Sequence, residues 1–144
     1  MPLEVVQIRR RVQSRLADLK RAAGVRRERV AVAEKAYETF LSGIAMPTFA
    51  TFAQALSAEG YPYHVVTPGG QVRLVSERSN RTFIDLRLDT SGPSALVVAE
   101  VSRERGSRVL SDERSVAEDV AIDAITDEQV VDFLLTAMAD LIER

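Results

Sequence analysis

The sequence predicts an α+β protein: a long N-terminal helix, a short second helix, an antiparallel meander of four or five strands, and a C-terminal helix packed on one face of the sheet. Three observations support this prediction. Apolar residues recur every three or four positions over residues 3–44, which is the helical period. The period changes to two after Tyr61, where short turns separate the apolar runs. A helix-capping pattern then precedes the last apolar segment, at residues 126–129.

The N-terminal stripe predicts one long helix with a coiled-coil-like repeat. It is interrupted only at Arg26. Gly24 lies inside the segment without shifting its phase, and a central glycine costs a helix about 1 kcal/mol relative to alanine. We therefore expect the helix to continue through Gly24 or to hinge there. The stripe consists of Val5, Ile8, Val12, Leu16, Leu19, Ala23, Val30, Ala33, Tyr37, Phe40 and Ile44.

The length of this helix raises the question of what covers its N-terminal half. About 40 helical residues span roughly 60 Å, whereas a compact chain of this size is roughly 40 Å across. A second copy packed as a coiled coil is the favoured cover, which predicts a homodimer. A fold-back at Gly24 and a foreign partner helix are the alternatives. The expected self-association residues are Val5, Ile8, Val12, Leu16, Leu19 and Ala23.

The second helix is predicted to begin after a break at Met46-Pro47, because proline disfavours helical geometry in the preceding residue. Thr48 would cap this helix. It would run to about Glu59, with Gly60 in the left-handed position after its end. Its expected buried face consists of Phe49, Phe52, Ala53 and Leu56.

Alternation of apolar and polar residues predicts the strands, and the short turns between them require antiparallel pairing. One face is apolar and the other charged, as expected when helices cover only one side. The predicted strands are 63–67, 71–77, 82–89, 95–105 and 108–110.

The region after the strands is harder to read from its pattern. Residues 111–117 are charged and predict a loop, and 116–125 fit either a short strand or a helical turn. Thr126 should cap the final helix, which would run to Glu143 and lie across the sheet. The chain is thus predicted to be one domain, 1–144, with a helical arm at 3–44 and an α+β body at 48–144.

Composition narrows the classes of function. The 144 residues include no cysteine, which excludes disulfides, thiolate metal sites and a thiol nucleophile. His64 is the sole histidine, so no histidine-based metal cluster is expected. We expect no catalytic residue, metal or cofactor. No apolar run reaches membrane-spanning length and no signal peptide is apparent, so a cytoplasmic protein without membrane contact is expected. Seventeen arginines against two lysines are typical of a GC-rich bacterial genome.

Charge is distributed unevenly along the chain. Residues 1–35 carry ten basic and four acidic side chains (+6), and residues 36–144 carry nine and seventeen (−8). Arg9, Arg10 and Arg11 are therefore candidates for contact with an anion or a partner, nucleic acid included. The arm has no aromatic residue before Tyr37, which removes base stacking. Neutralisation of the arm by an acidic body, its own or a partner's, is the simpler interpretation.

The strands supply two further candidate sites. Asp85, Arg87 and Glu100 could meet on the polar face of the sheet, where cross-strand ion pairs would also explain them. Three arginines near Gly106 could bind an anion or a partner. They are Arg103, Arg105 and Arg108.

Together these features predict a non-catalytic adaptor or chaperone-like protein that self-associates through its N-terminal helix and presents its sheet, or the sheet edge, to an unknown protein partner. The small acidic body with a closing C-terminal helix resembles bacterial secretion chaperones in size and charge. The resemblance covers no motif, and the basic arm departs from it. A nucleic-acid-associated regulatory protein is the alternative. A small enzyme or ligand-binding domain with a carboxylate/arginine site on the sheet is the third hypothesis.

Overall fold

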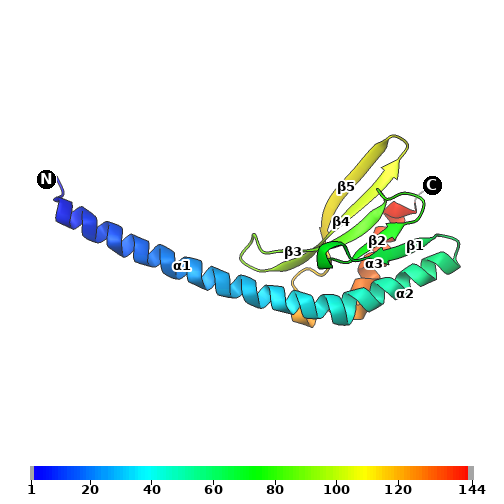
Figure 1. The fold of residues 1–144 in the computed structure, drawn as a ribbon, viewed down its shortest axis with the longest axis horizontal. Coiled ribbons are helices and arrows are strands. Elements are labelled where there is room, and N and C mark those ends of the chain that lie inside the picture. Colours follow the sequence, from blue (N-terminus) through cyan, green and yellow to red (C-terminus); the bar gives the residue numbers. More distant parts are fainter. Residues whose placement is uncertain (1, 143–144) are drawn as a thin grey trace. The chain divides into compact units, whose positions relative to one another are not determined.

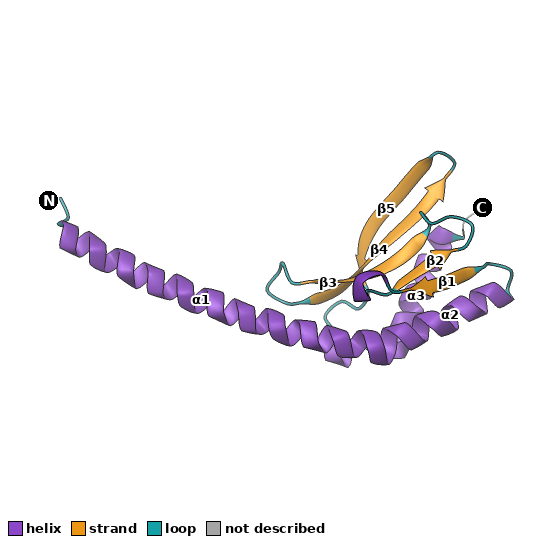
Figure 2. Cartoon of the chain, in the orientation of Figure 1, coloured by secondary structure: helices purple, strands orange, loops and turns teal. Residues whose placement is uncertain are grey.

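The computed structural model describes residues 2–142, and these form the predicted α+β arrangement (Figure 1, Figure 2). The helix end predicted at Glu143 lies outside the described residues. Contacts divide the chain into two compact units, the first ending at Val32 and the second beginning at Ala33. The division lies inside the first helix, so the sheet and the other helices belong to the second unit.

Helix α1 runs from Val5 to Phe40 and is continuous through Gly24. A Cβ atom added at Gly24 would meet no other atom within 4 Å, so no close approach requires glycine there. The alternative in which the chain folds back at Gly24 and packs the two halves of the stripe against each other is therefore not observed.

The predicted break at Met46-Pro47 is wrong, and so is the predicted cap at Thr48. A π-helical turn, Leu41–Ala45, joins α1 directly to α2, Met46–Ala58. The Met46 N–H donates to the Leu41 carbonyl five residues back, and Met46 keeps helical dihedrals despite the proline that follows it. Pro47 lies in the first turn of α2, where its missing N–H is tolerated. The wider turn thus accommodates the proline without ending the helix.

The π-helical turn also changes which residues face the core. It inserts one residue into the helical repeat, so that Ala45 is fully buried, whereas the predicted Ile44 is only partly buried. After the turn the buried positions are Phe49, Ala53 and Leu56, as predicted, with Phe52 partly buried beside them.

The end of α2 follows the predicted glycine signal. Gly60 has a φ of 90°, the left-handed conformation in which glycine is favoured. Its N–H donates to the Ser57 carbonyl at 3.1 Å, and the Tyr61 N–H donates to the Leu56 carbonyl at 2.9 Å. This pair of bonds is the Schellman motif, which satisfies the last carbonyls of the helix.

Five antiparallel strands follow in a meander, and their order in the sheet is their order in the chain. Turns join them directly, as the alternating pattern predicts. The strands are β1 (Tyr63–Val66), β2 (Arg73–Ser76), β3 (Phe83–Asp89), β4 (Leu96–Arg105) and β5 (Arg108–Ser115).

Strand β5 is longer than its sequence predicts. It was expected to end at Leu110, with a loop over 111–117, but it continues to Ser115, which pairs with Val98 of β4. Its residues are mostly exposed and polar on both faces, because β5 is an edge strand. An edge strand without an apolar face shows no alternation to detect. Of the two alternatives for 116–125, the helical turn is correct, since Ile122–Ala124 forms a short 3-10 helix.

The hydrophobic core lies between the helices and one face of the sheet. Helix α3, Asp127–Leu141, buries Val130, Leu134 and Ala137, and it contacts β4 and α2. Figure 1 shows α3 behind the sheet, as expected for a C-terminal helix covering one face. The sheet residues that are fully or almost fully buried in this core are Leu74, Ile84, Leu86, Ala99 and Val101.

The predicted capping box at the start of α3 is confirmed and supports a stability prediction. The Thr126 hydroxyl accepts from the Gln129 N–H at 3.2 Å, and the Gln129 side chain accepts from the Thr126 N–H at 2.9 Å. Thr126→Ala removes one of these bonds and should lower the free energy of unfolding by about 1 kcal/mol. Urea denaturation at one protein concentration, followed by circular dichroism, measures the change.

Thr136→Ala is the matched control on the same helix. The Thr136 hydroxyl donates to the Asp132 carbonyl four residues back, a bond that adds little to a helix. The control should change the free energy of unfolding by no more than about 0.5 kcal/mol. Equal losses in the two variants would contradict the role given to the capping box.

Candidate functional site

The N-terminal part of the apolar stripe on α1 is exposed. Between 47% and 80% of the surface of its large apolar residues is open to solvent, whereas Ala33, Tyr37 and Phe40 of the same stripe are buried in the second unit. Ala23 is partly buried. The exposed set, called the arm stripe below, is Val5, Ile8, Val12, Leu16 and Leu19.

Basic side chains border the arm stripe on both sides. Residues three or four positions apart are neighbours on a helix surface. Arg15 is therefore beside both Val12 and Leu19, and Lys20 is beside Leu16. Within residues 4–29, Glu4 is the one acidic residue that lies three or four positions from a residue of the arm stripe. It is one turn before Ile8. The bordering basic residues, all exposed, are Arg9, Arg11, Arg15 and Lys20, while Arg27 and Arg29 flank the continuation of the same helix face beyond Leu19.

The remaining basic residues of the arm lie elsewhere on the helix. Arg26 occupies a position within the stripe itself, and Arg10 lies on the opposite face. Arg21 also faces away from the stripe and forms an ion pair with Asp18. The predicted triplet at 9–11 is thus divided between the two flanks and the back of the helix.

The structure brings the predicted sheet residues together. Strand register places Arg73, Asp85, Glu100 and Glu113 in one row across β2, β3, β4 and β5. Arg87, two residues along β3, hydrogen-bonds to Glu100 and has nitrogens 3.5 Å from Asp85 Oδ2 and 3.6 Å from Glu113 Oε1. Two arginines are thereby shared among three carboxylates.

Asp85 is the buried member of this row, with 5% of its surface exposed. Its Oδ2 is 3.4 Å from an Arg73 guanidinium nitrogen, and its Oδ1 has no hydrogen-bond partner. Arg73 also lies over the ring of Phe83, 4.2 Å from its centroid. Within residues 2–142 no group of three histidine, cysteine or acidic side chains could hold a metal ion. The row forms a cross-strand ion-pair network.

The three arginines near Gly106 do not converge on one point. Arg103 lies on the face toward α3, where its Nη1 is 3.1 Å from Asp140 Oδ1. Arg105 and Arg108 pair in register at the two sides of the β4–β5 turn. Arg103 is therefore engaged in holding α3.

Arg114 joins Arg103 at Asp140 and was not anticipated, because its segment was expected to be a loop. Its guanidinium donates to Asp112 at 2.7 Å and also to Asp140. The hydrogen bond from Arg114 lowers the pKa of Asp140 below its ordinary value, and the bond from Arg103 adds to the effect. Two charge-assisted hydrogen bonds therefore connect the sheet to α3.

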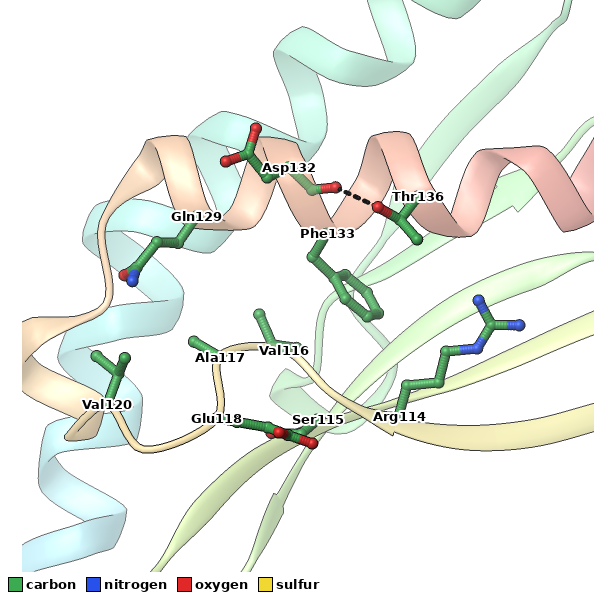
Figure 3. Close-up of a pocket in the computed structure, with 10 residues that line it drawn as sticks. All are labelled: Arg114, Ser115, Val116, Ala117, Glu118, Val120, Gln129, Asp132, Phe133 and Thr136. Carbon is green, nitrogen blue, oxygen red and sulfur yellow. Dashed lines mark hydrogen bonds between the residues drawn. The ribbon is translucent and has the colours of Figure 1, made fainter.

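A hollow of about 450 Å³ lies between α3 and the segment after β5 (Figure 3). Phe133 points from α3 toward the segment carrying Val116 and Ala117. Two of the polar side chains around it are engaged within the fold: Arg114 by carboxylates, and Gln129 by the capping box. Ser115 Oγ is buried without a hydrogen-bond partner, and the exposed Asp132 forms no ion pair within the described residues.

A second hollow, about 600 Å³, is lined by residues of α2 and of the first turns of α3. Its walls are mainly apolar, with Phe52 and Val131 partly buried and Ala55 exposed. This hollow is called the α2–α3 groove below. It is lined by Pro47, Thr48, Thr51, Phe52, Ala55, Asp127, Glu128 and Val131.

One sequence feature could have indicated the α2–α3 groove, namely the width of the apolar face of α3. The helical period alone did not show that this face makes two contacts. The apolar face of α3 is wider than one buried side needs: Val130 and Leu134 are buried, whereas Val131 is partly buried and Leu135 is 49% exposed. An apolar face of that width can serve two contacts. The second contact becomes visible only when α2 is placed beside α3.

No family model matches the chain, and searches of curated proteins and of solved structures find no match. Among the described helices, none is long and apolar enough to cross a membrane.

The Asp140 cluster supports a pH prediction. Asp140→Asn removes the charge that Arg103 and Arg114 share and should lower the free energy of unfolding by about 1 kcal/mol at pH 7. Because folding lowers the pKa of Asp140, its contribution is complete above the ordinary value of 3.8 and is lost as the pH falls through the lowered value. The difference between variant and wild type should therefore narrow toward pH 3 in urea titrations.

Asp132→Asn on the same helix is the control. Asp132 is exposed, and its carboxylate forms no ion pair within the described chain. Its replacement should change the free energy of unfolding by less than about 0.5 kcal/mol at any pH in this range. An Asp140→Asn loss that stays constant from pH 7 to pH 3 would contradict the ion-pair account.

Proposed function

We propose that this protein is a non-catalytic interaction protein that self-associates, as a dimer, through its N-terminal helix. The observation that carries the proposal is the arm stripe. Val5, Ile8, Val12, Leu16 and Leu19 repeat at helical spacing on one face, and each is about half exposed or more. Scattered exposed apolar residues are ordinary on a protein surface, but a contiguous row at one helical phase is typical of an interface.

Leaving this row in water costs free energy that a packed contact would recover. Complete burial of a valine, leucine or isoleucine side chain is worth about 1.5–3 kcal/mol. Half of that for each of five side chains gives several kcal/mol on each helix. The same stripe is buried farther along α1, at Ala33, Tyr37 and Phe40, which shows that its composition suits a packed contact.

The non-catalytic part of the proposal is supported by how the titratable groups are used. Asp85 and Glu100 are shared with arginines on the sheet. The imidazole of His64 lies 3.8 Å from Glu77, with about half of each side chain exposed. An exposed pair of this kind lacks the enclosure that tunes a catalytic base. We also place the protein in the cytoplasm, since a chain without cysteine suits a reducing compartment.

Nucleic-acid association through the arm is the second candidate, favoured by one observation: all nine basic residues between Arg9 and Arg29 are exposed. Phosphate contacts would make such binding fall steeply with salt. Binding to a random DNA duplex that disappears when Arg9, Arg10 and Arg11 are replaced by glutamine would support this function. Binding unaffected by those changes would exclude the arm as its origin.

The self-association proposal predicts the effect of charges placed within the arm stripe. Val12→Asp with Leu19→Asp puts two carboxylates into the contact and removes about 1 kcal/mol of apolar burial per site. Dimer affinity should fall at least 100-fold, a change of about 2.7 kcal/mol. Sedimentation velocity over a range of concentrations measures it.

The chain offers a closely matched control. Val6→Asp with Val25→Asp introduces the same charge on exposed valines of the same helix, outside the stripe. This variant should keep wild-type affinity, and both variants should retain the wild-type circular dichroism spectrum, which reports that the chain is folded. Equal weakening by the two pairs would show that helix propensity or net charge, rather than the arm stripe, governs association.

A further inference from the structure

We propose that the arm stripe of one copy docks into the α2–α3 groove of a second copy, instead of pairing with the same stripe of that copy. This inference rests on the proposed self-association and names the receiving surface. It follows from the charges beside the stripe, from the lining of the groove, and from the length of the groove, which accommodates the part of the stripe from Val12 to Leu19.

The bordering charges argue against a contact between two arms. In a coiled coil the residues flanking the apolar seam face flanking residues of the other helix. In a parallel pair Arg15 of one copy would face Lys20 of the other, and in an antiparallel pair basic flanks would again meet basic flanks. Such juxtaposition of like charges is costly in either orientation. Arg26 within the stripe adds a further cation at the seam.

The α2–α3 groove offers the opposite charge. Asp127 and Glu128 are both exposed at one end of it, and neither forms an ion pair within the described chain. The part of the sequence that contains the groove, residues 36–144, carries nine basic and seventeen acidic residues, a net charge of −8. An arm with basic flanks and a groove with acidic residues are electrostatically complementary.

The groove can accept about half of the arm stripe. Between Pro47 and Ala55 the groove follows eight residue steps of α2, about 12 Å. The last three residues of the arm stripe, Val12, Leu16 and Leu19, span seven steps, about 10 Å, and fit within this length. Three anchors at spacings of four and three residues are the usual pattern of a helix bound in a groove.

The flanking residues of those three anchors include Arg15 and Lys20, which places cations beside the segment that would enter the groove. Leu135, 49% exposed and one turn beyond Val131 on α3, can extend the apolar contact. Reciprocal exchange, in which each copy receives the other's arm, uses both surfaces of both copies and closes at a dimer.

The test mixes two variants that each lack one of the two surfaces. Val12→Asp with Leu19→Asp disables the arm. Ala55→Arg places a long cation at an exposed position of the groove. Each variant alone should have the mass of one chain, 15.9 kDa. An equimolar mixture should form a heterodimer of about twice that mass, because the intact arm of one chain can enter the intact groove of the other.

Ala50→Arg is the control for the groove variant, since Ala50 is exposed on α2 but does not line the groove. It should remain dimeric. Thr51→Arg, at another exposed position of the groove, should reproduce the Ala55→Arg result and guards against a folding defect in either variant. Circular dichroism and the urea midpoint verify that each variant is folded.

The possible failures are distinguishable. A wild-type chain that is monomeric would overturn both the proposed self-association and this inference. A dimeric wild type with groove variants that are also dimeric would leave self-association intact and overturn the groove as its receiving surface. Monomeric groove variants that fail to combine with the arm variant would likewise overturn the docking of arm into groove.

Discussion

Helix α1 carries one apolar stripe that is buried in the core at one end and exposed to solvent at the other. The rest of the structure depends on this constraint. From Ala33 onward the stripe is part of the core. Before it, from Val5 to Leu19, the same kind of side chains is exposed. Both halves belong to the one helix α1, Val5–Phe40. The exposed half is the reason to expect a partner surface.

The π-helical turn at Leu41–Ala45 allows the helix to continue into the body. It provides the wider turn before Pro47 and advances the apolar phase by one residue, from Ile44 to Ala45. A plain α-helix through this point would have rotated Phe49, Ala53 and Leu56 away from the sheet by about 100°. The turn therefore keeps the buried face of α2 aligned with that of α1.

Several ion pairs stabilise the body. In the sequence, the residues of these pairs were candidates for functional sites. Asp85, Arg87 and Glu100 form a cross-strand network, and Arg103 is used to hold Asp140 on α3. The basic residues of the arm are different, because four of them border a row of exposed apolar side chains. The proposed interaction surface therefore rests on the exposed apolar stripe together with its charges, and not on charges alone.

The sequence predicted those elements whose signals are local. The helical period of α1, the glycine after α2, the alternation in β3 and β4 and the capping box of α3 are all confirmed. It failed where the outcome depends on tertiary structure. Pro47 was expected to break the helix because the π-helical turn leaves no mark in the pattern, and β5 was cut short because an edge strand needs no apolar face.

The candidate sites divide in the same way. The row containing Asp85, Glu100 and Arg73 was foreseeable from strand alternation, although strand register alone revealed Glu113 as a further member. The α2–α3 groove could not be foreseen, since it depends on the packing of two helices far apart in the chain. Local patterns identified the surfaces of single elements but not those made between elements.

The mass of the unaltered chain in solution tests the central claim most directly. Light scattering over a range of concentrations at low salt should give about 31.8 kDa, twice the 15.9 kDa of one chain, with dissociation on dilution. That result is the one required if a second copy covers the arm stripe. A mass of 15.9 kDa at every concentration would contradict the account, because the exposed apolar row would then be stable in water without a second copy.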